Sequence, residues 1–532
     1  MSYRDKIFEL GWRRQDLPAG RDGAPRRWVV LGGGIAQDLA GHLREAGHQA
    51  DLIPAGAAPV SASETTSLTL GIDPVLTGPI PSTTPELGLA GVVLIAPPRP
   101  LDPAAAQRLA LDVIRLAAGM PGSPPPRLWL VTVGAVAVRP GEAGEPGLGT
   151  LRGLVRVLAL ERPALRATLV DLGSVTGAGH RADAGLAAAL AAGAAGATAL
   201  AAAGEAAADG VAALAAELIA DPPDDEVAWR DGERLVARLA RAQPPVPGPR
   251  RPVVRPGGAY VITGGYGGLG LLVARWLADR GAARIVLSGR GGPPPAARAA
   301  VAGLGARAMV VTGDVAEPGV AERLVAAACD GGVPLRGVVH AAGVFRDALA
   351  GDVTEAGLRA VWAPKVAGAW RLHEATAGAD LDWFVLFSSA AALLGSPGQA
   401  AYAAANAWLD AFAGWRRAAG LPATAVNWGI WADIGAAAGI ALGGIGPIGP
   451  DEGIAALETL LAELDQVCDR SGLDVCVITR RGNPARELAA VADQFSADAL
   501  VIGAPGNKWH QLAGSVPGWL ARHAQCPVIV VP

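Results

Sequence analysis

A tyrosine and an asparagine at helical spacing are the first residues in this sequence that could do chemistry. They lie within GQAAYAAANAWLDAF (398–412), where the run of alanines predicts a helix. Tyr402 and Asn406 are four residues apart and therefore share one helical face. A phenol with a polar partner can pass a proton to a substrate. Alternatively, the tyrosine packs its ring in a core while the asparagine bonds the backbone.

The segments around this helix alternate between short apolar runs and helical stretches. Strand signals lie within 27–53, 89–98 and 127–138, and a linker rich in proline and arginine follows at 241–258. This alternation predicts an α/β protein with two Rossmann-like, doubly wound parallel-sheet units and a short C-terminal α/β segment. The expected boundaries are 1–245, 246–464 and 465–532.

Composition argues against several classes of function. With a formal net charge of −4, the 532-residue chain has no basic excess that would favour nucleic acid or an anionic membrane as partner. Its longest apolar stretches, such as 185–203, are alanine and glycine, which predict no membrane span. The N-terminal residues show no secretory signal, and the four cysteines form neither a disulfide framework nor a CxxC pair. We therefore expect a cytoplasmic protein without a metal site.

A glycine-rich turn in the second unit predicts a dinucleotide site. GAYVITGGYGGLGLLVARWLADRGAARIVLSGRGG (258–292) reads as strand, glycine turn, helix and strand. Its TGxxxGxG pattern is formed by Thr263, Gly264, Gly268 and Gly270. Such glycines allow a close approach of the backbone to a pyrophosphate at a helix N-terminus. Arg290 suits the 2′-phosphate of NADPH, whereas an acidic residue there would favour NAD. The alternative is a glycine turn that binds nothing.

The N-terminal unit contains a similar turn. VVLGGGIAQDLAGHL (29–43) imitates the loop, but it lacks the TGxxxGxG pattern, and no ribose-reading residue is evident near Asp51. We therefore expect a scaffold that has the shape of a dinucleotide fold without its site.

Two further segments supply partners for Tyr402. LDWFVLFSSAAALLGSPGQAAYAAANAWLDAF (381–412) predicts a strand that ends at Ser388–Ser389, thirteen residues before the tyrosine. With the glycine turn, these features resemble the short-chain dehydrogenase/reductase superfamily, and within it the ketoreductase domains of modular polyketide synthases. Ordinary members carry YxxxK, but Asn406 stands at the lysine position. In the ketoreductases the lysine lies upstream, and here APKVAGAWRLHEAT holds Lys365, the only lysine between residues 7 and 507.

The resemblance implies a catalytic set of four residues: Lys365, Ser389, Tyr402 and Asn406. Reducing a ketone requires hydride on carbon and a proton on oxygen, and a phenol with a pKa of about 10 is a reluctant partner at neutral pH. A neighbouring ammonium stabilises the phenolate and brings its pKa toward the working range. The serine would hold the carbonyl oxygen, and the asparagine would position the lysine or a water.

The same resemblance assigns the remaining site residues. The cofactor-binding set is Thr263, Gly264, Gly265, Tyr266, Gly268, Leu269, Gly270, Ser288, Arg290, Asp314, Val315, Ala341, Ala342 and Gly343. The residues expected to orient substrate and set stereochemistry are Asp347, Leu394, Pro397 and Gln399. Phe345–Arg346–Asp347 keeps the last residue of the LDD motif that accompanies D-configured products, and Leu394 stands where L-producing members carry tryptophan. This pattern predicts a D-3-hydroxy product.

The resemblance spans roughly residues 7–464. Within it, 1–245 corresponds to the non-catalytic structural subdomain and 246–464 to the catalytic subdomain. From about residue 465 the chain resembles the C-terminal half of a universal stress protein domain, with strand-like runs at 474–479, 498–503 and 527–531. Its loop Gly503-x2-Gly506-x7-Gly514–Ser515 is two residues shorter than the ATP-binding loop of such domains.

Three hypotheses follow from these features. The first is an NADPH-dependent reductase of β-ketoacyl thioesters, with an acyl carrier protein and other polyketide synthase modules as partners. The second is a non-reducing structural or docking module, which is disfavoured because all four catalytic residue types are present. The third is an adenine-nucleotide-binding stress module fused to a reductase, which depends on the C-terminal segment alone.

Overall fold

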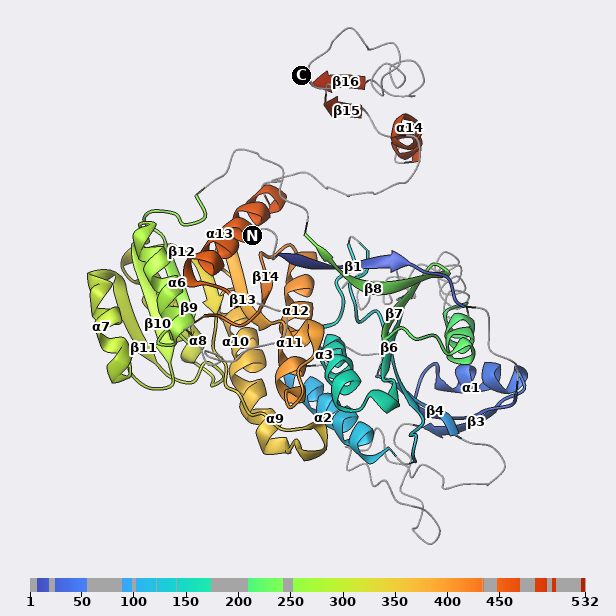
Figure 1. Ribbon diagram of the computed structural model, residues 1–532. Coiled ribbons are helices and arrows are strands. Elements are labelled where there is room, and N and C mark those ends of the chain that lie inside the picture. Colours follow the sequence, from blue (N-terminus) through green and yellow to red (C-terminus); the bar gives the residue numbers. More distant parts are fainter. Residues whose placement is uncertain are drawn as a thin grey trace, which may run out of the picture. The chain divides into compact units, whose positions relative to one another are not determined.

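The structure is a computed structural model with two compact units, one up to Ser471 and one from Gly472. The first unit contains two sheets, which confirms the expected α/β class with two parallel-sheet units (Figure 1). In the described part of the chain, no helix is both long and apolar enough to cross a membrane. The residues that the structure describes are 7–18, 24–54, 89–97, 102–120, 122–139, 141–173, 209–242, 252–432, 434, 447–468, 484–494, 500–503 and 528–531.

The first sheet, built from residues up to 242, has the strand order β1-β8-β7-β6-β5-β4-β2-β3. Strands β2 to β7 pair in parallel, whereas β8 and β1 are antiparallel additions at one edge. Its strands are β1 (Phe8–Arg14), β2 (Arg27–Gly32), β3 (Gln49–Pro54), β4 (Leu89–Ile95), β5 (Arg127–Val133), β6 (Thr168–Leu172), β7 (Glu226–Arg230) and β8 (Glu233–Arg241). Its helices include α1 (Ala36–Glu45), α2 (Pro103–Gly119), α3 (Pro146–Glu161) and the short η2 (Pro163–Leu165). Nearly continuous apolar runs in β2, β4 and β5 are buried, as expected for strands covered on both faces.

The second sheet, built from residues 252–432, has the order β11-β10-β9-β12-β13-β14 and is parallel throughout. Its strands are β9 (Ala259–Thr263), β10 (Arg284–Gly289), β11 (Ala308–Thr312), β12 (Leu335–His340), β13 (Trp383–Ser389) and β14 (Thr424–Trp428). The chain moves outward from β9 to β11 and then returns to β12 on the other side. The carboxyl end of β9 is therefore a topological switch point, where such sheets bind ligands.

The helices of this second half of the unit, residues 252–468, lie between these strands or follow the last of them. They are α6 (Gly268–Asp279), α7 (Pro295–Gly303), η3 (Gly305–Arg307), α8 (Val320–Cys329), η4 (Asp330–Gly332), η5 (Ala350–Asp352), α9 (Glu355–Trp362), η6 (Ala363–Ala367), α10 (Gly368–Ala375), α11 (Ala391–Leu394), α12 (Ala400–Ala418) and α13 (Pro450–Cys468). The alanine-rich segment forms α12, as predicted. Gly420 ends it with φ +75°, and Leu421 N–H donates to the Arg416 carbonyl at 2.9 Å, a left-handed glycine cap.

Helices α3 and α12 lie side by side and join the two halves (Figure 1). A Cβ on Gly149 would stand 2.5 Å from Cβ of Ala411, and one on Gly153 would stand 2.3 Å from the Ala403 carbonyl oxygen. Thr150 Oγ1 donates to the Ala404 carbonyl at 3.0 Å. The two backbones are thus so close that only glycine fits at these points of α3.

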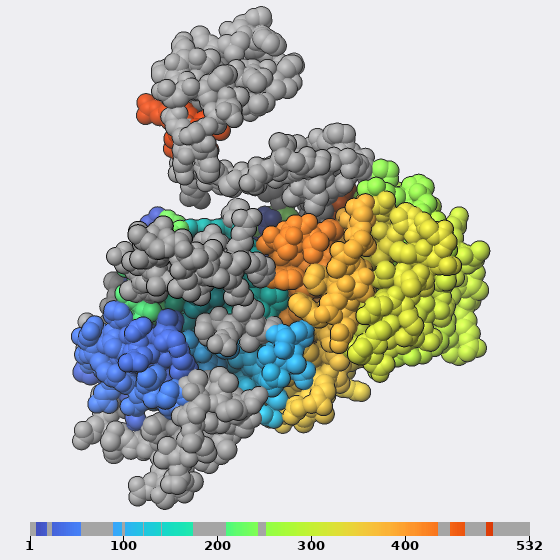
Figure 2. Space-filling view, turned by 180° about the vertical axis from the view of Figure 1, so that it is seen from behind, coloured from blue at the N-terminus to red at the C-terminus, as the bar shows by residue number. Residues whose placement is uncertain are grey.

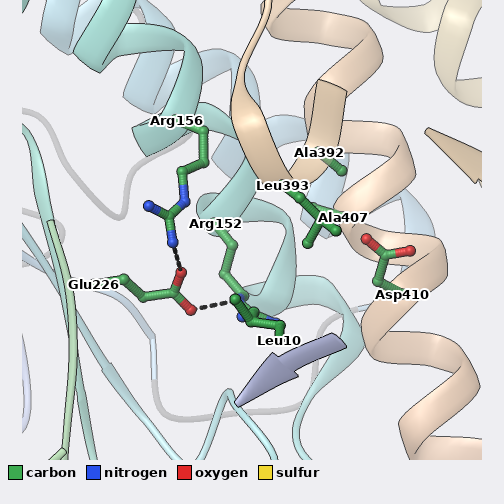
Figure 3. Close-up of a pocket in the computed structure, with 8 residues that line it drawn as sticks. All are labelled: Leu10, Arg152, Arg156, Glu226, Ala392, Leu393, Ala407 and Asp410. Atoms are coloured by element: carbon green, nitrogen blue, oxygen red, sulfur yellow. Dashed lines mark hydrogen bonds and ion pairs between the residues drawn. The ribbon is translucent and has the colours of Figure 1, made fainter. Parts of the chain in front are cut away.

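Charged residues also lie where α3 meets α12. Arg152 Nε and Arg156 Nη2 lie 2.5 and 2.6 Å from the carboxylate oxygens of buried Glu226 (Figure 3). These three residues and Asp410 of α12 line a cavity of about 10 Å³, roughly the space of one water. Asp410 Oδ1 is buried and has no partner among the described residues. Burial raises the pKa of Asp410 to about 6, although Asn427 Nδ2 donates to it at 2.7 Å.

Helix α2 makes a second junction between the halves. Trp362 Nε1, at the end of α9, donates to the Pro103 carbonyl at 2.8 Å. Figure 2 shows the light-blue atoms of α2 adjoining the golden atoms of the second half. The first half therefore supports the second along two helices.

The C-terminal unit consists, in its described residues, of α14 (Pro484–Gln494) and the parallel pair β15 (Leu500–Gly503) and β16 (Val528–Val531). The two strands correspond to the runs expected at 498–503 and 527–531. The run expected at 474–479 and the loop from Gly506 to Ser515 lie outside the described residues.

Candidate active site

The glycine loop between β9 and α6 leaves no room for side chains. Gly264 has φ +66°, and a Cβ there would lie 2.7 Å from the Ala341 carbonyl oxygen. A Cβ on Gly270 would lie 2.4 Å from the Gly264 carbonyl oxygen. Helix α6 begins at Gly268, and no side chain caps its first N–H groups. The turn therefore offers close backbone approach and uncapped N–H donors to an anion.

Polar groups of β10 lie beside this loop. Gly265 N–H donates to the Ser288 carbonyl at 2.9 Å, while the buried Ser288 hydroxyl has no partner in the described part of the chain. Tyr266 O–H donates to the Leu287 carbonyl at 3.2 Å. Arg290 is exposed just after β10 and forms no hydrogen bond or ion pair with any described residue. An uncommitted guanidinium at this position can bind a phosphate.

The loops after β11 and β12 complete this edge of the sheet. Asp314 Oδ1 accepts from Ala316 N–H at 3.0 Å and so forms a tight turn. Ala341 N–H donates to the Thr263 carbonyl at 3.2 Å. A Cβ on Gly343 would lie 3.1 Å from Cε of Lys365. Apolar packing against the cores is contributed by Leu269, Val315 and Ala342.

The four predicted catalytic residues come from α12, η6 and the end of β13. The ammonium of buried Lys365 donates to the Phe387 carbonyl at 2.9 Å and lies 5.3 Å from the centroid of the Tyr402 ring. Asn406 Nδ2 donates to the Tyr402 carbonyl at 2.8 Å, which is the backbone bond of the alternative interpretation, but its buried Oδ1 has no partner among the described residues. Ser389 Oγ accepts from Ala391 N–H at 3.2 Å at the end of β13. The lysine and the tyrosine are thus neighbours in space, although 37 residues separate them in the sequence.

A groove of about 260 Å³ lies beside Phe345, and Tyr402 is not among the residues that line it. The Phe345 ring stacks on the Tyr402 ring with centroids 4.5 Å apart, and Phe345 is 37% exposed. The groove is lined by Phe345, Arg346, Asp347, Ala348, Asp352, Val353, Thr354, Gly357 and Ala401. Sequence reasoning treated Phe345 only as a departure from a motif and missed that its ring covers the tyrosine.

The residues expected to control stereochemistry lie in two loops. Gln399 Nε2 donates to Asp347 Oδ1 at 3.3 Å, and Ala348 N–H donates to the Gly398 carbonyl at 2.7 Å. Pro397 lies in the second of these loops and is exposed. Leu394, at the end of α11, is 44% exposed and is not bonded to the Asp347–Gln399 pair. The structure therefore joins two of the four residues directly.

His340 is a site residue that sequence reasoning missed. Its buried ring lies between Thr263 Oγ1, 2.8 Å from Nδ1, and the Lys365 carbonyl oxygen, 2.9 Å from Nε2. The histidine thus ties the glycine loop to the turn that carries the lysine. A polar residue at the end of the apolar run VVH was the available signal.

Family models match the chain in two places. The KR domain matches residues 258–433, and the universal stress protein family matches 442–532, which begins earlier than the predicted residue 465. A phenolphthiocerol/phthiocerol polyketide synthase subunit of Mycobacterium tuberculosis is 44% identical over 356 residues, which are 66% of this chain and 18% of that protein. Phthioceranic/hydroxyphthioceranic acid synthase of Mycobacterium bovis is 53% identical over 222 residues, 39% of this chain and 10% of that protein. The chain thus spans less than a fifth of these relatives.

Solved structures cover most of the chain. A structure of A-type ketoreductases from a modular polyketide synthase has a TM-score of 0.67 at 30% identity, over 87% of this chain and 92% of the other. The chain belongs to the ketoreductases of modular polyketide synthases. The first ketoreductase of the tylosin synthase is also similar, with a TM-score of 0.65 at 30% identity over 87% of this chain and 91% of the other. Membership implies a nicotinamide-dependent oxidoreductase that reduces a ketoacyl intermediate.

Burial governs the protonation of the groups around the tyrosine of this ketoreductase. Burial raises the pKa of Tyr402, opposite to the direction expected from a neighbouring ammonium; the side chains of Asn406 and Ser389 lower it in part, and the carboxylate of Asp347 raises it further. Burial lowers the pKa of Lys365 to about 8, against the attraction of Asp410. Burial also lowers the pKa of His340 to about 4, so this imidazole is neutral and bridges its partners without charge.

Proposed function

We propose that this ketoreductase uses NADPH to reduce the β-keto group of an acyl chain, held as a thioester on an acyl carrier protein, to a D-3-hydroxyacyl thioester. The observation that carries the proposal is the Lys365–Tyr402 pair, 5.3 Å from ammonium to ring centroid, covered by the Phe345 ring that borders an open groove. In this proposal 1–245 is the structural subdomain, 246–464 is the catalytic subdomain and 465–532 is a separate segment.

The glycine loop and its surroundings fit a dinucleotide. Side chains at Gly264 and Gly270 would collide with backbone within 2.7 Å, so the loop keeps space for a pyrophosphate. The Ser288 hydroxyl lacks a protein partner, and the Arg290 guanidinium is uncommitted among the described residues. Arg290 would bind the 2′-phosphate that distinguishes NADPH from NADH. When bound, the cofactor supplies the hydride.

The four catalytic residues divide the work on the ketone oxygen. Ser389 Oγ donates a hydrogen bond to the carbonyl oxygen and polarises it. Tyr402 O–H transfers its proton to this oxygen as the carbonyl carbon is reduced, which leaves a phenolate. The Lys365 ammonium stabilises that phenolate. Asn406 Oδ1, which is buried without a partner, holds a water that returns a proton to the tyrosine.

The groove favours an extended acyl substrate over a small ketone. It is open, and apolar side chains are exposed around it: Phe345 is 37% exposed and Leu349 is 54% exposed. Leu160 is 50% exposed and lies beside Gly395, near Leu394. An acyl chain tethered through a thioester arm could pass along such a surface. The relatives are polyketide synthases, and in this proposal a carrier protein presents the chain to the groove.

The D configuration rests on the loop that carries Asp347. This residue keeps the last position of the LDD motif and is bonded to Gln399 at 3.3 Å. The tryptophan of L-producing members is replaced by exposed Leu394. These two features favour entry of the thioester from the Asp347 side of the groove.

A direct assay tests the proposal. The purified chain is mixed with NADPH and a short β-ketoacyl N-acetylcysteamine thioester, and the product is separated by chiral chromatography. We expect NADPH oxidation matched by formation of the D-3-hydroxy thioester. Binding of NADPH without turnover, on this thioester and on a carrier-bound one, would favour the non-reducing module. Mainly L product would refute the stereochemical part.

A further inference from the structure

Glu161 is a carboxylate of the first half that bonds two loops of the second. It is the last residue of α3. Its Oε2 accepts from Ala350 N–H at 2.7 Å, and its Oε1 accepts from Gly398 N–H at 2.7 Å. These partners lie 189 and 237 residues away in the sequence. One side chain therefore satisfies a backbone donor in each of two separate loops.

These two loops carry the residues that orient substrate in the proposed function. Ala350 follows Phe345 and Asp347 at the start of η5. Gly398 precedes Gln399, which is the N-cap of α12, and Tyr402 lies one turn later. The loops also pair directly, through a parallel bridge between Ala348 and Gln399. Glu161 thus fixes the loop that lines the groove relative to the loop that precedes α12.

The position of this carboxylate argues for a specific role. The C-terminus of a helix carries partial negative charge, so an acidic residue at the end of α3 is disfavoured by the helix itself. Short hydrogen bonds from two N–H groups to a charged oxygen offset that cost, and such bonds are about twice as strong as neutral ones. A simple contact between the two halves does not need a charge at this place, since α3 already packs tightly on α12.

We propose that Glu161 is a positioning residue that fixes the two loops relative to each other and thereby orients the ketone over Tyr402. It does not touch the reacting atoms. It acts through the Asp347–Gln399 contact and through the Phe345 ring that covers the tyrosine. The inference rests on the proposed reduction and names a specificity-determining residue for it.

The test uses the full chain with Glu161→Gln and Glu161→Ala. The glutamine keeps the size of the side chain but can accept only one of the two N–H bonds. Each charge-assisted bond is worth about ten- to hundredfold in an equilibrium, so we expect KM for the β-ketoacyl thioester to rise about tenfold or more, with a smaller fall in kcat. The share of the minor alcohol should rise in both variants, and NADPH affinity should change less than about twofold because the glycine loop is untouched.

Glu458→Gln is the matched control, since it removes the same charge from a surface pair with Arg280 in the second half. It should leave KM and the alcohol ratio unchanged. A lower melting temperature with unchanged KM and alcohol ratio in folded Glu161→Gln would overturn the inference and leave Glu161 as a structural contact. If Glu161→Ala does not fold, the glutamine variant decides. Absence of turnover in the unaltered chain would instead refute the proposed function.

Discussion

The two sheets share the arrangement of their first strands and glycine turns, but they differ in the hydrogen bonds made by their polar groups. In each, the first strand of the parallel winding has the next strand of the chain on one side and a later strand on the other: β2 lies between β3 and β4, and β9 lies between β10 and β12. Both first strands lead into a glycine turn pressed against the neighbouring strand. A Cβ on Gly32 would lie 2.8 Å from the Ile95 carbonyl oxygen, as one on Gly264 would lie 2.7 Å from that of Ala341. The shape of a dinucleotide fold is therefore present twice.

In the first sheet the polar groups at the strand ends are bonded to one another. Asp51, within β3, pairs with Arg27, the first residue of β2, at 2.7 Å. Asp171 at the end of β6 accepts from Thr132 Oγ1 at 2.6 Å and from Arg230 Nη2 at 2.6 Å. In the second half, Ser288 Oγ of β10 and Asn406 Oδ1 of α12 are buried and have no partner among the residues that the structure describes. The comparison teaches that the fold alone does not distinguish a ligand-binding sheet edge from a structural one. The distinguishing feature is the presence of polar groups without hydrogen-bond partners in the protein.

The largest effect is expected from Tyr402→Phe. Loss of a positioned proton donor typically costs about 10²- to 10⁴-fold in rate, so kcat should fall by that much. NADPH affinity should stay within about twofold, because the glycine loop is unchanged. Steady-state kinetics and a binding titration measure both quantities.

Thr132→Val is the counterpart in the first sheet. It removes a buried hydroxyl from a strand end whose polar groups are already paired, so it should lower stability by about 1 kcal/mol and leave kcat nearly unchanged. A large fall in kcat at Thr132, or normal turnover by Tyr402→Phe, would break the comparison.

Gly153→Ala should destabilise the junction through which the scaffold supports α12. The new Cβ would stand 2.3 Å from the Ala403 carbonyl oxygen, so the helices must separate, at a cost of about 1–3 kcal/mol. Gly41→Ala in α1 is the matched change in open space, and it should stabilise by roughly 0.5–1 kcal/mol. Denaturant unfolding compares the two, and equal stabilities would contradict the close packing.

Arg290→Ala should erase most of a ten- to hundredfold preference for NADPH over NADH, the range that one charge-assisted bond supports. Arg27→Ala, in the corresponding unit of the first sheet, should not alter the preference because Arg27 is engaged with Asp51. The ratio of kcat/KM for the two cofactors gives the answer. An unchanged ratio in Arg290→Ala would assign the phosphate to other residues.

The smallest effect is a pH dependence set by Lys365. Its pKa is lowered to about 8 by burial, so the ammonium that stabilises the phenolate is lost above about pH 8. We expect kcat/KM for reduction to fall there by up to about tenfold per pH unit. Because the folded pKa lies below the ordinary 10.5, the unfolded chain binds more protons between these values. This group therefore stabilises the fold as pH rises, and the loss of rate is not unfolding.

Lys365→Met checks this assignment. Its residual activity should be low and should lack the fall above about pH 8. A retained fall at the same pH in this variant would mean that a group other than Lys365 sets the profile.

Several features could be predicted because they depend on neighbours in the sequence. The spacing of Gly264, Gly268 and Gly270 sets a turn at a helix start, and the alanine run around Tyr402 forms α12. The strand that ends at Ser389 follows from an apolar run that is buried throughout. Lys365 was found because it is nearly the only lysine in the chain, and its position next to Tyr402 rested on a resemblance.

Other features could not be predicted because they join distant segments. Nothing near Glu161 in the sequence indicates that its carboxylate meets Ala350 and Gly398, since that depends on how α3 packs on α12. The Phe345 ring reaches Tyr402 only because two loops pair across the groove. The bridge made by His340 likewise requires β12 to lie between the glycine loop and η6.

The amino-acid sequence by itself determined the two parallel sheets and the glycine turn, because strand, turn and helix preferences act over a few residues. Tertiary structure alone decided which polar groups stayed without partners and what surrounds the tyrosine. Whether a hydroxyl, carboxylate or ammonium is paired depends on groups brought together over tens to hundreds of residues. The sequence already distinguished the two glycine turns by the missing TGxxxGxG pattern, but only the fold shows that Asp171, Thr132 and Arg230 bond one another at the edge of the first sheet, whereas Ser288 Oγ in the second has no partner among the described residues.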